Sequence, residues 1–177
     1  MSDYLVATTV DSLRAERLLP GPLERVWAYL TDSPLRGQWL AAGEMQLRAG
    51  GRVEHIFHNS ALTGNDEAPP EKYRDQGCEG SMHGRITVCE PMHLLGYTWG
   101  EGLADPSEVR FELTPRGKKV LLVVTHSRLG QRDARLSVAA GWHTHLDILA
   151  ARLEAREPEG FWRRHTQLEK DYEQRIA

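Results

Sequence analysis

Apolar and polar positions in the first third of the chain predict one strand and two short helices. Residues 12–19 have the composition of a strand that ends at a Pro-Gly-Pro turn, whereas residues 1–11 carry no strong signal. Beyond the turn, apolar residues spaced by three and four predict a helix with Pro22 at its first position. Its apolar stripe comprises Leu23, Val26, Trp27 and Leu30. A second helical turn is expected to follow, with Ser33 as its cap.

The middle of the chain predicts an antiparallel meander. Residues 44–58 indicate a hairpin of two short strands. Residues 59–80 are polar without a sustained period, which is typical either of an entrance lid or of a solvated excursion at the sheet edge. Four strand patterns separated by turns then follow, at 81–91, 93–100, 107–115 and 118–129. Strands joined by short turns pair antiparallel.

The last third is helical. Asp133 is a candidate cap for a helix of about twenty residues, roughly 30 Å long. Residues 157–160 break this helix, and an amphipathic pattern predicts a second one after them. The stripe of that second helix comprises Phe161, His165, Leu168 and Tyr172. We therefore expect a domain of residues 12–156 and an additional C-terminal helix within residues 157–177.

In chain order, these elements predict an α+β fold. A curved antiparallel sheet of about six to seven strands is expected to wrap the long C-terminal helix. Two short helices follow the first strand, and the extra helix ends the chain. The core then lies between the long helix and the concave face of the sheet.

Composition narrows the possible functions. The formal net charge is −3 and the pI is near 6.2, whereas a nucleic-acid-binding domain normally carries a basic surplus. Cys78 and Cys89 form no CxxC motif, and we expect reduced thiols in a cytoplasmic protein. No stretch approaches the roughly 18 apolar residues that a membrane span needs. Residues 1–10 lack the features of a secretion signal.

Two histidines on the predicted long helix, His143 and His145, resemble half a metal site, but their spacing excludes it. At about 100° per residue they point about 200° apart, so they cannot bind one metal together. His143 is expected to border the apolar stripe at a cavity edge, and His145 to be solvated or at a rim. Trp142 should anchor the helix to the sheet, and Gly141 should let the helix backbone pack closely on its neighbours. Ile148, on the back of the helix, should be covered by the terminal helix or by a second subunit.

Other candidate chemistry is sparse. His55 and His58 lie three apart on a strand and face opposite sides, and His55 and His126 are expected to point inward. No carboxylate or thiol stands at ligand spacing, so we predict no metal. The GxSxG and GxGxxG motifs are absent, so we assign no catalytic residue and no cofactor. These absences favour a binding protein over an enzyme.

Four segments in order carry a resemblance to a known superfamily. They are "RVWAYLTDSPLRGQWL" (25–40), "GRITVCEPMHLLGYTWG" (84–100), "VRFELTPRGKKVLLVVTHSRL" (109–129) and "AAGWHTHLDILAARL" (139–153). The chain resembles the SRPBCC or START-like superfamily, in particular the group named after activators of a heat-shock chaperone ATPase. The resemblance implies a helix-grip fold whose cavity, between sheet and long helix, holds a hydrophobic ligand in many relatives. A separate N-terminal domain supplies much of the chaperone contact in relatives that activate the chaperone, so we do not expect that contact here.

The implied cavity defines the candidate ligand-binding site. Strand alternation and helix position place at its wall or mouth Trp39, Val53, His55, Phe57, Met82, Ile86, Tyr97, Trp99, Val109, Phe111, Val124, His126, Trp142, His143 and Leu146. The main hypothesis is a protein that binds a small, largely hydrophobic or aromatic molecule. One alternative is an enzyme of the polyketide-cyclase or hydrolase kind, with His126 or His55 as general base. The other is an interaction protein, either a chaperone co-factor or a homodimer.

Overall fold

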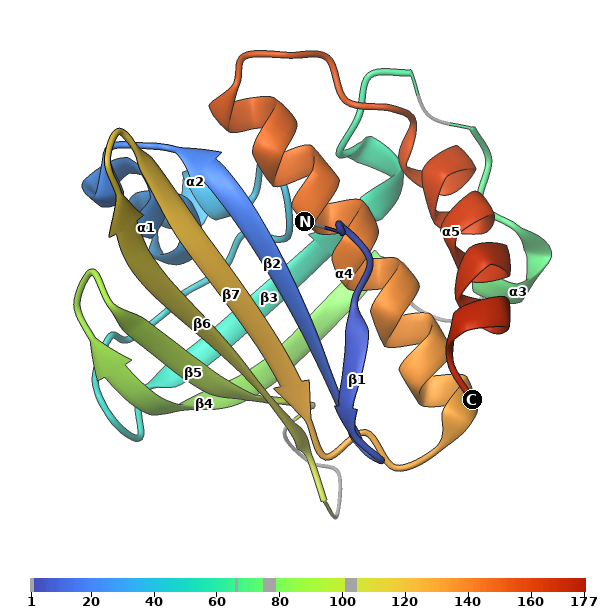
Figure 1. Ribbon diagram of the computed structural model, residues 1–177, viewed down its shortest axis with the longest axis horizontal. Helices are drawn as coiled ribbons and strands as arrows, with labels where there is room; N and C mark the ends of the chain where they lie inside the picture. Colours follow the sequence, from blue (N-terminus) through green and yellow to red (C-terminus); the bar gives the residue numbers. More distant parts are fainter. Residues whose placement is uncertain (1, 66, 75–78, 101–104) are drawn as a thin grey trace.

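The structure is a computed structural model in which residues 2–65, 67–74, 79–100 and 105–177 are described. These residues form one sheet of seven antiparallel strands in the order β1-β2-β7-β6-β5-β4-β3. The strands are β1 (Val6–Thr9), β2 (Ser12–Pro20), β3 (Arg52–His58), β4 (Glu79–Glu90), β5 (Leu94–Trp99), β6 (Ser107–Arg116) and β7 (Lys119–Ser127). The sheet curves around a long helix (Figure 1), so the predicted helix-grip α+β fold is confirmed.

Two layers of helix lie on the sheet. The helices are α1 (Leu23–Thr31), α2 (Ser33–Arg36), the 3₁₀ turn η1 (Asn59–Ala61), α3 (Glu71–Arg74), α4 (Arg132–Leu153) and α5 (Phe161–Arg175). The long helix α4 packs on the sheet beside β2, and α5 packs on α4 from the other side (Figure 1). None of the helices described here has the length and apolar character needed to cross a membrane.

Strand alternation determines which side chains enter the core. The register of β6 and β7 sets Val109 opposite His126, Phe111 opposite Val124, and Leu113 opposite Leu122. Residues opposite one another share a face of the sheet, and all six are buried on the inner face, as predicted. The other side of α4 is covered as well, since Ile148 is only 2% exposed within this single chain. No second subunit is needed to bury it.

Two predictions about strands are wrong. An edge strand, β1, precedes β2, and its four side chains are all exposed, so no apolar alternation marked it in the sequence. The expected first strand of the hairpin, near residues 44–48, is absent, and two isolated bridges, at Ala42 and Met45, join this segment to β3. The guanidinium of Arg36 donates hydrogen bonds to the carbonyl oxygens of Ala41 and Gly43. These carbonyls are then not available for regular pairing with a neighbouring strand.

The helix starts are shifted by one or two residues from their expected positions. Pro22 is the cap of α1 rather than its first residue. The cap of α2 is Asp32, whose carboxylate accepts the N–H of Leu35, and the expected cap Ser33 is already helical. At α4 the cap position is Gln131, and Asp133 lies in the first turn. In that position its negative charge still stabilises the positive N-terminal end of the helix dipole.

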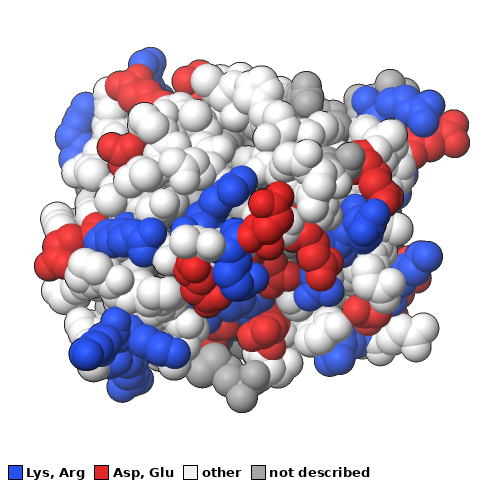
Figure 2. Space-filling model, turned by 90° about the horizontal axis from the view of Figure 1, so that it is seen from above, with Lys and Arg blue, Asp and Glu red and all other residues white. Residues whose placement is uncertain are grey.

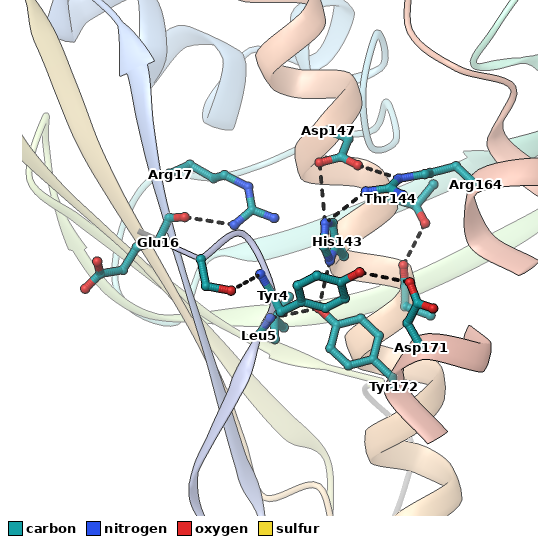
Figure 3. Close-up of polar contacts among 12 residues, drawn as sticks. Tyr4, Leu5, Glu16, Arg17, His143, Thr144, Asp147, Arg164, Asp171 and Tyr172 are labelled. Atoms are coloured by element: carbon teal, nitrogen blue, oxygen red, sulfur yellow. Dashed lines mark hydrogen bonds and ion pairs between the residues drawn. The ribbon is translucent and has the colours of Figure 1, made fainter. Parts of the chain in front are cut away.

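A buried polar network ties the N-terminal segment and α5 to the outer side of α4 (Figure 3). The Tyr172 hydroxyl accepts the N–H of Leu5 at 2.7 Å and lies 2.8 Å from Nδ1 of His143. Nε of Arg164 donates to the carboxylate of Asp147 at 2.9 Å. His143 is 1% exposed, and burial lowers its pKa to about 3, so the ring is neutral at physiological pH. His143 therefore faces α5 and does not stand at the edge of a cavity.

We expect Tyr172→Phe to lower the free energy of unfolding by about 2 kcal/mol. The change leaves the buried Leu5 N–H and the His143 ring without their shared partner, and each orphaned polar group costs about 1–3 kcal/mol. Urea denaturation at neutral pH measures the loss. Tyr4→Phe is the matched control, because its hydroxyl bonds Asp171 in a part-buried position and its removal should cost well under half as much. Equal losses in both variants would contradict this account of the network.

Candidate functional site

A pocket of about 210 Å³ opens where α4, the start of α5, the end of the sheet and the segment after β3 meet. It is lined by Leu40, Phe57, Asn59, Tyr73, Trp99, His126, Ser137, Val138, Gly141, Trp142, His145, Phe161, Trp162 and His165. Most of these residues carry an aromatic or imidazole ring. The pocket is therefore mainly apolar, with a few polar atoms set among rings, which is the usual character of a small-molecule site.

One face of α4 forms the inner wall. Ser137, Gly141 and His145 recur every four residues, so they form a single stripe along the helix. Gly141 was expected to permit close backbone packing, and that expectation is wrong. A Cβ atom added to Gly141 would meet nothing within 4 Å. The missing side chain instead leaves open volume at the middle of the pocket wall.

His145 is a buried member of this wall, which corrects the expectation of a solvated or rim residue. It is 6% exposed, and its Nδ1 lies 2.8 Å from the carbonyl oxygen of Trp39. In a fold with one sheet and a single helix on it, this side of α4 would face water. Here the loop that carries Trp39 and the terminal helix α5 cover it. Burial lowers the pKa of His145 to about 4, so its ring is neutral.

The two inward histidines, His55 and His126, are held in different surroundings. Nδ1 of His126 accepts the indole N–H of Trp142 at 2.9 Å, and Nε2 lies 2.7 Å from the hydroxyl of Ser107. Both ring nitrogens of His126 are thus engaged, and burial lowers its pKa to about 3. His55 is fully buried beside Tyr97 in the core and does not line the pocket. Neither ring presents a free lone pair to a molecule in the pocket.

The outer wall comes from the start of α5, a helix to which the sequence assigned no role. The Phe161 and Trp162 rings meet edge to face at 4.8 Å between centroids, and Phe161 stacks on His165 at 5.8 Å. Ser60 and Tyr73, from the segment after β3, hold this wall in place. The Trp162 indole donates to Ser60 at 3.0 Å and stacks on Tyr73 at 5.4 Å. The polar segment after β3 therefore packs against α5 beside the pocket.

The predicted cavity residues divide into three groups. Phe57, Trp99, His126 and Trp142 line the pocket. Most of the others fill the core between sheet and α4, namely Trp39, Val53, His55, Ile86, Tyr97, Val109, Phe111, Val124 and Leu146. Met82 is partly buried on β4 opposite His55, and His143 lies on the opposite side of α4. The space between sheet and helix is thus largely packed, and the open volume is displaced toward α5.

A signal in the sequence could have indicated part of the missed wall. Ser137, Gly141 and His145 share a stripe at a spacing of four, and two small residues on a helix face leave room beside them. The aromatic start of α5 was recognised as an apolar stripe, but nothing in the sequence specified that it packs over that gap. The positions of Tyr73 and of the turn that carries Asn59 depend on contacts with α5 that join residues about 100 positions apart.

Charge and metal-binding chemistry contribute little to this picture. Within the described residues, no group of three or more His, Cys, Asp or Glu side chains could hold a metal ion. Basic and acidic side chains are intermixed on the face shown in Figure 2, and they form no basic stripe there of the kind that nucleic acid binding needs. Cys89 is a free thiol, and Cys78 lies outside the described residues.

Comparisons with known proteins agree with this architecture. The family described as Activator of Hsp90 ATPase homolog 1-like protein matches residues 20–154. A protein of Bordetella parapertussis, solved by solution NMR, is 44% identical over 97% of this chain and 90% of its own, with a TM-score of 0.81. CalU16 from Micromonospora echinospora shares the fold at 23% identity, over 94% of this chain and 88% of its own, with a TM-score of 0.67.

DynU16, encoded in the dynemicin biosynthetic locus, also shares the fold. It is 22% identical over 84% of this chain and 49% of its own, with a TM-score of 0.62. No curated protein sequence matches the chain.

Proposed function

We propose, from the premise that this chain belongs to the Activator of Hsp90 ATPase homolog 1-like family, that it binds a small aromatic molecule in the pocket between α4 and α5. The proposal rests on one observation. Aromatic rings surround open volume beside Gly141, a position of α4 that has no side chain. Aromatic rings contact one another favourably at centroid separations of about 4.5–7 Å in offset or edge-to-face geometry. A planar ligand inserted among Trp99, Trp142 and Phe161 would make contacts of that kind.

The size of the pocket limits the ligand. An apolar cavity of roughly 150 Å³ is large enough to bind benzene. A volume of about 210 Å³ therefore accommodates one aromatic ring with a few substituent atoms. A larger ligand would have to extend out through the opening or move α5. The enzyme alternative has no comparable support, because His126 has both ring nitrogens engaged and His55 lies in the core.

Gly141→Leu is expected to abolish binding of one-ring probes. A Cβ atom at this position meets nothing within 4 Å, and the leucine branch beyond it is expected to occupy the pocket. Leucine is also a better helix former than glycine by roughly 0.8 kcal/mol, which supports folding of the variant. Saturable quenching of tryptophan fluorescence by toluene, anisole and phenol measures binding, because three tryptophans line the pocket.

Ala134→Leu is the matched control, an exposed position in the first turn of the same helix. This variant should bind the probes as the unmodified protein does. Binding that persists undiminished in Gly141→Leu would place the ligand elsewhere. If none of the three probes bound the unmodified protein saturably, the proposal itself would be wrong.

A further inference from the structure

Three neutral histidines line the pocket, and His126 has both ring nitrogens engaged. The hydrogen bonds of the other two, His145 and His165, determine what each offers to a ligand. Nδ1 of His145 lies 2.8 Å from the Trp39 carbonyl oxygen, which can only accept a hydrogen bond. Nδ1 must therefore carry the ring proton of His145. Nε2 of the same ring is then a bare lone pair, and no hydrogen bond to a described residue engages it.

His165, across the pocket on α5, is arranged in the same sense. Its Nδ1 is buried without a hydrogen-bond partner in the described part of the chain and lies 3.5 Å from a carboxylate oxygen of Glu169. Burial raises the pKa of Glu169, but hydrogen bonds from Lys72 and Tyr73 lower it by more than burial raises it. The pKa therefore lies below its usual range, and the carboxylate is ionised. A negative charge beside Nδ1 favours the tautomer with the proton on that nitrogen. Nε2 of His165 is again left as an acceptor.

A third acceptor belongs to Asn59. Its Oδ1 atom is buried and has no hydrogen-bond partner among the described residues. The indole donors of two pocket tryptophans are by contrast in use, since Trp142 donates to His126 and Trp162 donates to Ser60. Buried polar groups in folded proteins nearly always have a partner. Nε2 of His145 and Nε2 of His165 are therefore acceptors that a hydrogen-bond donor in the pocket can engage.

We infer that the pocket selects aromatic molecules that carry a hydroxyl group, with the phenolic O–H donating to Nε2 of His145 or of His165. The inference rests on the proposed function and specifies its ligand class. A hydroxyl on a single ring adds one heavy atom, which the volume permits. An aromatic carboxylate is disfavoured, because its oxygens would meet lone pairs rather than donors. Benzoate should accordingly bind worse than phenol.

The test compares phenol with anisole, which keeps the ring and the oxygen but lacks the donor. Calorimetric or fluorescence titrations at pH 7.5 should show phenol binding roughly tenfold more tightly than anisole, a difference typical of one well-placed hydrogen bond. In His165→Phe, which keeps the stack on Phe161, and in His145→Phe, the preference for phenol should shrink while the affinity for anisole is retained. His83→Phe, an exposed histidine on β4, is the control and should leave both affinities unchanged.

Nitrogen NMR of the histidine rings adds a measurement that needs no variant. Phenol, but not anisole, should shift the Nε2 resonance of His145 or of His165. Equal affinities for phenol and anisole would overturn the inference while leaving the proposed function intact. A preference for phenol that survives both histidine variants would also overturn it. If neither probe bound, both the inference and the proposed function would fail.

Discussion

Acidification from pH 7.5 to pH 5 is expected to destabilise the protein severely. Five histidines are 6% exposed or less, and burial is the largest cause of their lowered pKa values. Those pKa values are about 3 for His55, His126 and His143, and about 4 for His145 and His165. An unfolded histidine titrates near 6.5. The unfolded chain therefore binds protons below pH 6.5 that the folded chain does not bind until pH 3–4.

The sign of the effect follows from proton linkage. Stability from these groups is fully present above pH 6.5 and is lost as the pH falls from 6.5 toward the folded pKa values. Each histidine that stays neutral at pH 5 removes about 2 kcal/mol. Two or three of them would cancel a typical folding free energy at the lower end of the 5–15 kcal/mol range. Asp147, whose pKa is raised by burial, acts in the opposite direction, but it is a single group.

Urea denaturation at several pH values between 5 and 7.5 tests this expectation directly. The slope of the unfolding free energy against pH counts the protons that unfolding takes up. His165→Phe should reduce that slope by up to one proton, since it removes one of the five groups. A free energy of unfolding that stayed constant from pH 7.5 to pH 5 would show that the buried histidines titrate normally.

Arg36→Met is expected to cost about 3–5 kcal/mol of folding free energy. Arg36 is completely buried, and its guanidinium donates to four backbone carbonyls. The accepting residues are Thr31, Ala41, Gly43 and Glu54. Methionine keeps the length of the side chain but leaves those carbonyl oxygens without their donors. The loop between α2 and β3 should then lose its fixed path.

Two comparisons make the Arg36 prediction specific. Arg36→Lys keeps the positive charge but lacks the planar fork of donors, so we expect most of the loss to remain. Arg52→Met removes an exposed arginine from the neighbouring strand and should change stability by less than about 1 kcal/mol. Thermal and urea unfolding measure all three variants. A mild effect of Arg36→Met, similar to that of Arg52→Met, would show that water can replace the guanidinium at these carbonyls.

The architecture could be predicted from the sequence because period-2 and period-3.6 patterns reflect burial on one face of an element. The alternation of Val109, Phe111 and Leu113 indicated both the strand and its inner face. What escaped prediction depends on polar groups that no period describes. Arg36 lies in an ordinary helical turn of the sequence, and only the folded chain brings the carbonyls of Gly43 and Glu54 to it.

The candidate site was only partly predictable, for a related reason. Phe57 and Trp99 face inward by strand alternation, and they were found in this way. His145 was misplaced because the helical pattern of α4 implied two sides, one packed and one wet. In the structure a second layer covers the second side, so the polar residues on that side of α4 are buried as well. The position of α5 relative to α4 is a tertiary property that the sequence of either helix leaves open.

The placement of α5 separates one wall of the pocket from the framework of the fold. The family match ends at residue 154, whereas Phe161, Trp162 and His165 supply one wall of the pocket. Changes in these three side chains alter the shape and hydrogen-bonding character of the pocket without touching a single strand of the sheet. Relatives with the same grip of sheet on helix can therefore differ in this wall through a single turn of α5, although Phe161 and Trp162 are also part of the buried core.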